Sequence, residues 1–410
     1  MLRRFLRYLE KVFDFEAETA LLRDARVDPQ IPPPTVFRSV FLMFALRLGS
    51  LNRLEQELRR GGAWRKLLGG RPPSADTVGY SLCRFSLEEL RVLVAGHHHQ
   101  AWRNKAVKGR AGQRFRVVAM DGHELGSSEA RCCDQCLVRE VPKKDRTVTQ
   151  YYHRVVVAQW VGVTPPGILD VERVRPGEGE VVAARRLWGR ILKAYGRLMD
   201  VVSCDAIYLE APFLKDVLAA GKHFVVVLKQ ENRELYQDAQ QLRALREPQV
   251  IPAAGKTSRI WDLEGLTSFT TLGSPVRVVW AQEQKTLTRV VGGKGQEITE
   301  ESTWVWVTDL SSREASAQEI QRWGHDRWDI ENRAFNELSR DWELDHSFVH
   351  DPTAIEVLLL ALAVAFLTTY LFYERNLKDD AKRFLSRLTL ADRFRQDLPL
   401  VLAAIPQPSG

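Results

Sequence analysis

The order of strand and helix signals between residues 114 and 229 limits the possible folds more than any other feature. Three runs rich in β-branched and aromatic residues come first, and helical and strand-like patterns then alternate. In order they are RFRVVAMDG, YYHRVVVAQWVG, GILDVERVR, EVVAARRLWGRILKAYGRL, MDVVSCDA, the helical segment from Ala211 to Ala220, and KHFVVVLK. Strands that alternate with helices in this way build an α/β domain, so we expect a mixed sheet with flanking helices.

A β-rich segment interrupts this pattern between residues 231 and 312. After the helical stretch ENRELYQDAQQLRAL, several strand-like runs follow, separated by Gly, Pro and polar turns. Helical periodicity then returns, with Ser311 and Glu314 at the spacing of a capping box, and an apolar helix is predicted at 354–373. We therefore expect a mainly β insertion within the α/β domain.

Residues 1–112 have helical periodicity and carry much of the positive charge. The chain has 59 Lys+Arg against 52 Asp+Glu, a net charge of +7, and three basic runs lie within the first 116 residues. Ser74 or Asp76, and then Ser86, are suitable helix starts. Short helices flanked by arginines are typical of a helix-turn-helix-like DNA-binding region, but a small helical bundle with solvated basic faces fits equally well.

The apolar run VLLLALAVAFLTTYLFY, residues 357–373, is the membrane candidate of the sequence. It is uncharged over 17 residues, at the lower limit of a membrane span, and contains Thr368, Thr369 and Tyr370. A buried core helix is therefore favoured, and no membrane partner is expected. The N-terminus predicts an amphipathic helix rather than a signal peptide, and five cysteines argue against a disulfide framework. We expect a cytoplasmic protein.

Three carboxylates occur in apolar contexts. Asp121 ends the strand VVAM, Asp205 ends VVSC, and Glu331 lies on the apolar stripe of a helix predicted over RWDIENRAFNEL. Ligands gather at the carboxyl ends of strands in open α/β sheets, and a buried carboxylate must be paired, protonated or bound to a metal. Structural roles also fit each residue: a turn or helix cap for the aspartates, and an i, i+4 pair with Arg327 for Glu331. A pair of Mg²⁺ ions about 3.5–4 Å apart would explain all three together.

The order of these features resembles the DDE transposases of bacterial insertion sequences, in the branch with a β insertion between the second Asp and the Glu. The resemblance covers roughly residues 35–375. Its most specific pieces are AMDGHEL, YYHRVVVAQWVG with PGEGE, VVSCDAIYLEAPFL with HFVVVLK, and RWDIENRAFNEL followed by WELDH.

The resemblance implies an RNase H-like catalytic core that binds Mg²⁺ or Mn²⁺ and cuts and rejoins DNA. Its metal ligands and catalytic residues would be Asp121, Asp205 and Glu331. The partner would be double-stranded DNA, both the terminal inverted repeats and the target. The protein would act as a dimer in the synaptic complex. When bound to DNA it would be associated with the bacterial nucleoid. We expect the chain to begin with an N-terminal DNA-end-binding region (1–112). The first part of the core (113–230), a β insertion (231–312), the rest of the core (313–376) and a C-terminal tail (377–410) would follow.

The signature around the family's glutamate is only partly present. The family places a tyrosine seven residues before the Glu, an arginine four before and a lysine about seven after; this chain has Gly324, Arg327 and Leu338. We expect Arg327 to touch DNA phosphate or to orient Glu331. Charge and stacking from the other positions would come from neighbours, Trp323, His325 or Arg340.

Other interpretations of the partial signature stay open. Lys229 at the end of VVVLK could hold DNA phosphate, and a solvated strand-end lysine fits as well. The missing signature residues are also compatible with a decayed or domesticated transposase that only binds DNA. A third alternative is an RNase H-like nuclease that hydrolyses without joining.

The cluster CCDQC contains Cys132, Cys133 and Cys136. A CxxC spacing gives two thiolates suited to Zn²⁺, and His153, His123 or the third cysteine would complete the set. A second CxxC or HxxxH is missing from the sequence. A structural Zn²⁺ site and a turn with reduced thiols are therefore both open.

Overall fold

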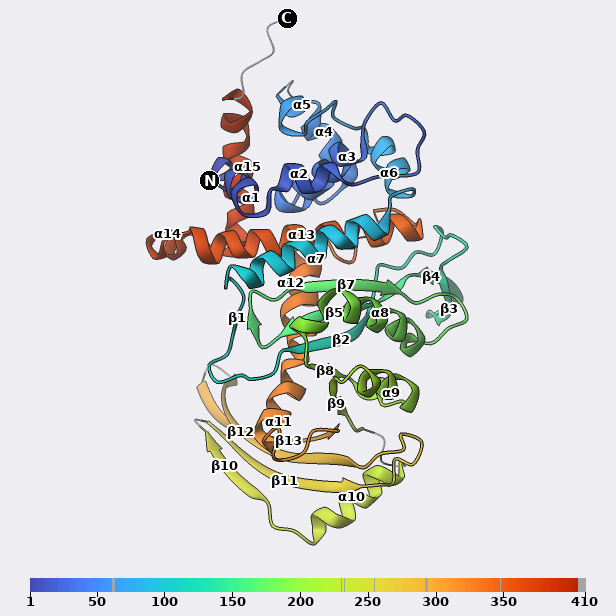
Figure 1. Ribbon diagram of the computed structural model, residues 1–410, viewed down its shortest axis with the longest axis vertical. Coiled ribbons are helices and arrows are strands. Elements are labelled where there is room, and N and C mark those ends of the chain that lie inside the picture. Colours follow the sequence, from blue (N-terminus) through green and yellow to red (C-terminus); the bar gives the residue numbers. More distant parts are fainter. Residues whose placement is uncertain are drawn as a thin grey trace, which may run out of the picture. The chain divides into compact units, whose positions relative to one another are not determined.

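The computed structural model describes residues 1–60, 63–229, 231, 233–253, 255–291, 294–346 and 348–404. It contains a large mixed sheet and many helices (Figure 1), which confirms the predicted mixed α/β class. The chain forms two compact units, both discontinuous in sequence. The first consists of residues 1–111, 122–194 and 332–410, and the second of residues 112–121 and 195–331.

The sheet of the second unit combines parallel and antiparallel strands, in the order β10-β11-β12-β13-β9-β8-β2. Strand β8 lies parallel to both β2 and β9, and every residue of its sequence VVSC is buried. Such continuous apolar runs are typical of strands covered on both faces. The bounds are Val117–Glu124 for β2, Val201–Cys204 for β8 and His223–Val227 for β9, with helices α9 at Ala211–Ala219, α10 at Glu234–Ala244 and α11 at Ala317–Asp326.

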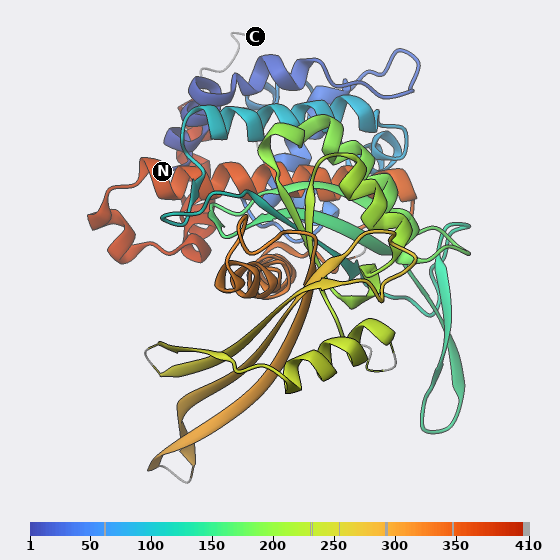
Figure 2. The same ribbon diagram turned by 60° about the horizontal axis from the view of Figure 1, so that its bottom comes forward.

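Four antiparallel strands lie in the sequence between Asp205 and Glu331. They are β10 (Gln249–Ala253), β11 (Lys256–Leu266), β12 (Val276–Val291) and β13 (Lys294–Thr308). Figure 2 shows the long strands of this group side by side. β13 pairs with β9, with Trp306 opposite Val227, so the inserted strands extend the same sheet that carries β8.

The first unit is mostly helical around one apolar helix. Helix α13, Pro352–Asn376, packs against α3 (Pro33–Ala45), α7 (Leu87–Arg103) and β7 (Ile168–Arg173). It is long and apolar enough to cross a membrane, but 94% of its most apolar window is buried inside the protein. The run predicted as a core helix is therefore one.

The first unit contains further helices and strands besides these. The further helices are α1 (Leu2–Phe13), α2 (Phe15–Ala20), α4 (Leu51–Leu58), α5 (Trp64–Leu67), α6 (Ala75–Leu82), α8 (Glu180–Tyr195), α12 (Asn336–Trp342), α14 (Asp379–Phe384) and α15 (Arg387–Ala403). The strands form the pairs β1 (Lys108–Gly109) with β6 (Val163–Thr164), β3 (Leu137–Pro142) with β4 (Thr147–Tyr152), and β5 (Arg154–Val161) with β7.

The predicted helix start at Ser311 is wrong. Ser311 and Glu314 do hydrogen-bond, with 2.7 Å between Ser311 Oγ and Glu314 Oε2, but their contact closes a turn. The capping box that begins α11 is made by Ser316 and Glu319, five residues later. Two Ser-x-x-Glu sequences follow one another here, and local spacing does not distinguish between them.

Three buried carboxylates of the first unit share a cluster of arginines. Asp170 and Glu172 lie on β7, and Glu356 lies on α13. Glu356 accepts hydrogen bonds from Arg91 and Arg173, the latter at 2.9 Å, and Arg91 also donates to Asp170 at 3.0 Å. Two arginines of α8 complete the cluster. Arg186 donates a hydrogen bond to Glu172, and Arg190 donates one to Asp170. Each buried charge therefore has a partner, as burial requires.

Glu356→Ala is expected to lower the free energy of unfolding by about 3 kcal/mol, because it leaves the buried guanidinium of Arg173 without its carboxylate. The measurement is urea unfolding followed by circular dichroism. The matched control is Asp380→Ala, which removes an ion pair with Arg383 whose side chains are 86% and 75% exposed, and should change stability by less than about 0.5 kcal/mol. Equal effects of the two substitutions would contradict a structural role for the cluster.

Candidate active site

Asp121 and Asp205 follow the last residue pair of β2 and β8. Asp205 comes directly after β8, but β2 continues to Glu124, so the prediction that Asp121 ends its strand is wrong. Strands β2 and β8 are parallel and in register, with Met120 opposite Cys204, and each aspartate is the next residue along its strand. The carboxyl ends of adjacent parallel strands are where α/β folds place their ligands. The two aspartates therefore lie on neighbouring strands where the parallel pairing of β2 and β8 ends.

Arg327 connects Glu331 to Asp121. Its Nη1 donates to Asp121 Oδ2 and to Glu331 Oε1, each at 2.7 Å. Because both oxygens contact the same nitrogen, they are no further apart than twice this distance. Arg327 is only 2% exposed. The pKa of its guanidinium is raised, because the charges of Asp121, Glu331 and Asp205 outweigh the effect of burial, which acts to lower it.

Lys229 supplies the charge opposite Asp205. Its Nζ donates to Asp205 Oδ1 at 2.8 Å, and its side chain is 55% exposed. Burial acts to raise the pKa of Asp205, but the hydrogen bond from Lys229 and the charge of Arg327 outweigh it, and the pKa is lowered. This carboxylate is therefore ionised at neutral pH and sits next to an accessible ammonium group.

Glu331 does not lie on a buried stripe as expected. Its side chain is 48% exposed, and Trp328 of the same predicted stripe is 37% exposed. The expectation assumed one continuous α-helix, whereas α11 ends at Asp326 and residues Ile330–Phe335 form a π-helix. A π-helix shifts the phase of the side chains, so a 3.6-residue period does not carry through it. π-Helical turns are frequent at functional sites.

The donor set of Asp121, Asp205 and Glu331 fits a hard divalent cation. All the ligand atoms would be carboxylate oxygens, which Mg²⁺ and Mn²⁺ prefer. Two of these oxygens already share one positive group, Arg327 Nη1, so the carboxylates converge on a cation. Within the described residues the carboxylates do not form a group with all ligand atoms within 4.8 Å of one another, so holding an ion would require them to move closer.

Gly324 occupies the position where the resemblance expects a tyrosine, and packing explains it. A Cβ atom on Gly324 would lie 2.0 Å from Trp306 Nε1 on β13. Trp306 is buried, so it cannot simply move aside. The adjacent Trp323 is also buried, and its carbonyl accepts a hydrogen bond from Ser203 of β8 at 3.1 Å. Position 324 has no room for a side chain and the ring of Trp323 is buried, so neither position presents an exposed aromatic ring.

An aromatic groove near Glu331 escaped the sequence analysis. The rings of Trp304 and Trp328 meet edge to face at 4.7 Å between centroids, and both line a groove of mixed charge. Its charged residues are Lys256, Lys285, Glu283, Glu300 and Glu301, and Lys256 pairs with Glu283 at 2.7 Å. His325, expected to compensate for the missing tyrosine, instead contacts Glu283 at 2.7 Å. The alternation in the sequence WVWV could have placed Trp304 and Trp306 on one face of a strand.

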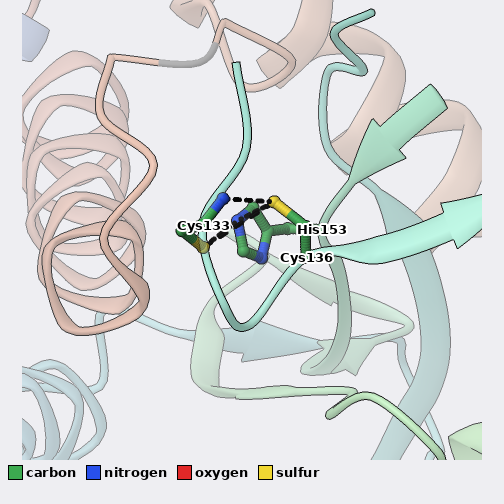
Figure 3. A group of neighbouring side chains, drawn as sticks. All are labelled: Cys133, Cys136 and His153. Carbon is green, nitrogen blue, oxygen red and sulfur yellow. Dashed lines mark hydrogen bonds between the residues drawn. The ribbon is translucent and has the colours of Figure 1, made fainter. Parts of the chain in front are cut away.

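Arg340 and the cysteine cluster belong to the first unit. Arg340 lies on α12, exposed, and pairs with its neighbour Asp341. Cys133, Cys136 and His153 come together (Figure 3), whereas the third predicted cysteine, Cys132, is exposed and lies outside the group. The alternative ligand His123 is used elsewhere, since its Nε2 contacts Asp345 at 2.7 Å.

Gly324→Ala is expected to destabilise the protein by about 1–3 kcal/mol, because its methyl group would overlap Trp306. The matched control is Gly189→Ala in α8, where nothing lies within 4 Å and alanine should stabilise the helix by up to about 1 kcal/mol. Thermal unfolding of both variants checks the difference in sign. A Gly324→Ala variant as stable as the wild type would show that Trp306 does not exclude a side chain.

Glu283 should make the protein sensitive to acid. Although burial acts to raise its pKa, hydrogen bonds from His325, Lys256 and Gln321 hold it at about 2, below the ordinary value of 4.5. The resulting stabilisation is complete above about pH 4.5 and is lost as the pH falls toward 2. Glu283→Gln should therefore lower the unfolding midpoint most near neutral pH, and the difference from wild type should shrink in acid. A difference that does not change with pH would contradict this assignment.

Comparison with known families agrees with this geometry. Residues 171–367 match the family model described as transposase DDE domain. The match includes Asp205 and Glu331 and begins after Asp121. No curated protein matches the chain. The resemblance expected from the sequence is confirmed for residues 171–367, which are similar to the transposase DDE domain family.

Proposed function

We propose that the protein is a transposase that binds the ends of an insertion sequence and catalyses metal-dependent cleavage and strand transfer of DNA. The observation that carries the proposal is the arrangement of three carboxylates from separate elements: Asp121 and Asp205 where the pairing of β2 and β8 ends, and Glu331 held to Asp121 through Arg327. The family match supports the same reaction class, because it spans two of the three.

Asp121, Asp205 and Glu331 would hold Mg²⁺ or Mn²⁺. When bound, the ions would activate the attacking water or hydroxyl and stabilise the leaving oxygen of a phosphodiester. Arg327 would act by positioning, because it is buried and already orients two of the carboxylates. It is too enclosed to serve as a general contact for the DNA backbone.

Lys229 is the better candidate for a DNA phosphate contact. It is exposed, adjoins Asp205 and carries a point charge that suits a phosphate oxygen. Cleavage would free a 3′-hydroxyl, which the same site would direct at target DNA by a second in-line displacement. In each step the oxygen of a water or a hydroxyl group attacks the phosphate directly, so no covalent bond to the protein forms.

The partners would be the terminal inverted repeats and the target duplex. The basic helical region 1–112 would recognise the ends, and the inserted strands β10–β13 would contribute further DNA contacts through Lys256 and Lys285. Arg340, exposed on α12, remains a proposed phosphate contact. Synapsis of two ends requires at least two chains in the working complex.

Asp205→Asn and Glu331→Gln are each expected to reduce DNA cleavage by about a hundredfold or more, because charge stabilisation in the transition state is lost while the side-chain shape is kept. The assay follows Mg²⁺- or Mn²⁺-dependent nicking and joining of a duplex that carries the sequence flanking the gene. Gel shift in the same buffer should show retained binding.

Asp238→Asn is the matched control, an exposed aspartate on α10 that should leave cleavage unchanged. Wild-type protein that binds this duplex but never cuts it would reject the enzyme and favour a protein that only binds DNA. Cleavage without joining would instead indicate a nuclease. Variants that cut as well as wild type would remove the three carboxylates from the reaction.

A further inference from the structure

Four sulfur and nitrogen ligands converge at one point in the first unit. Cys133 and Cys136 come from the loop before β3, His153 links β4 to β5, and His350 lies in the segment between α12 and α13. Figure 3 shows the side chains of the first three pointing toward one another. His350 approaches the same cluster, with its Nδ1 3.8 Å from Cys136 Sγ.

Four of the six distances among these atoms are those of an occupied tetrahedron. His350 lies outside the group of Cys133, Cys136 and His153, whose ligand atoms are all within 4.8 Å of one another, so binding would draw it closer. Zn–S and Zn–N bonds of about 2.3 and 2.0–2.1 Å at tetrahedral angles place two sulfurs about 3.8 Å apart, and a sulfur and a nitrogen about 3.6 Å apart. The two sulfurs, Cys133 Sγ and Cys136 Sγ, are 3.7 Å apart. His153 Nε2 is 3.5 Å from each sulfur. With His350 Nδ1 at 3.8 Å, four edges agree to within about 0.3 Å.

We propose that Cys133, Cys136, His153 and His350 bind one structural Zn²⁺ ion. The site differs from the carboxylate site in chemistry, because thiolate and imidazole select zinc whereas Mg²⁺ and Mn²⁺ prefer oxygen. With four protein ligands it has no open position for a substrate, which is the arrangement of structural rather than catalytic zinc.

The surroundings of the cluster favour a metal over other roles for the thiols. A disulfide needs sulfurs about 2.05 Å apart, well short of the 3.7 Å found between Cys133 and Cys136. The backbone N–H of Cys133 donates to Cys136 Sγ at 3.2 Å, which stabilises negative charge on that sulfur. Cys136 and His153 are buried, so water does not complete their hydrogen bonding.

The ion would fasten segments far apart in sequence. His350 is more than two hundred residues from Cys136, and it directly precedes Asp351, the N-cap that accepts a hydrogen bond from Ala354 N at 2.9 Å. Binding would therefore fix the start of α13 to the β3–β4 hairpin. Since zinc binds the folded arrangement of ligands, its binding free energy would add to the stability of the first unit.

Metal content of the full-length protein tests the proposal without reference to DNA cleavage. Protein purified without chelator and measured by mass spectrometry of metals should contain one Zn²⁺ per chain. Replacement by Co²⁺ should give the visible absorption of a tetrahedral thiolate site, and removal by a strong chelator should lower the Tm. Wild-type protein that retains no zinc and shows no such Co²⁺ spectrum would overturn the site.

Single variants test the ligand set. Cys136→Ser, His153→Asn and His350→Asn should each lose most of the bound zinc or shift the Co²⁺ spectrum, with circular dichroism checking the fold. Cys132→Ser is the matched control, since this neighbouring cysteine is exposed and outside the cluster. Loss of zinc in Cys132→Ser, with zinc retained in His350→Asn, would show that the fourth ligand is Cys132 and overturn the proposed set.

Discussion

The buried guanidinium of Arg327 is the interaction on which the candidate active site depends. A charge that is 2% exposed is tolerated only with close partners, and Asp121 and Glu331 provide them. The same ion pairs fix the end of α11 against the end of β2. Around them, the Ser203 bond to the Trp323 carbonyl and the contact of Gly324 with Trp306 hold the helix in place. The stability of the fold and the arrangement of the candidate active site therefore depend on the same atoms.

The features that could be predicted from the sequence are those encoded locally. Continuous apolar and β-branched runs predicted the strands before Asp121 and Asp205, although β2 continues past Asp121 to Glu124, and an uncharged apolar run predicted the core helix α13. Glu331 was misplaced because a π-helix interrupts the periodicity. Gly324 and His350 depend on residues far away in sequence, Trp306 and Cys136, and no local pattern shows such contacts. The discontinuous compact units are likewise set by tertiary packing.

The two proposed metal sites differ in the hardness of their ligand atoms. One offers three carboxylates and no sulfur, and the other two thiols and two imidazoles. Zinc and magnesium would each find its preferred donors. In the carboxylate site Arg327 and Lys229 offset two of the three negative charges, and each carboxylate already has a cationic partner without a metal ion. The sulfur site has no such cation among its own ligands.

The position of α13 has a consequence for how the chain is made. Helix α13 covers α3 and α7, but it is translated some 300 residues after α3. At about 5–20 residues per second, the interval is on the order of tens of seconds. Residues 195–331, most of the second unit, emerge as one continuous block during that time and can begin to fold. The first unit can close its core only after α13 has been made, so the faces of α3 and α7 that pack against α13 lack this partner until then.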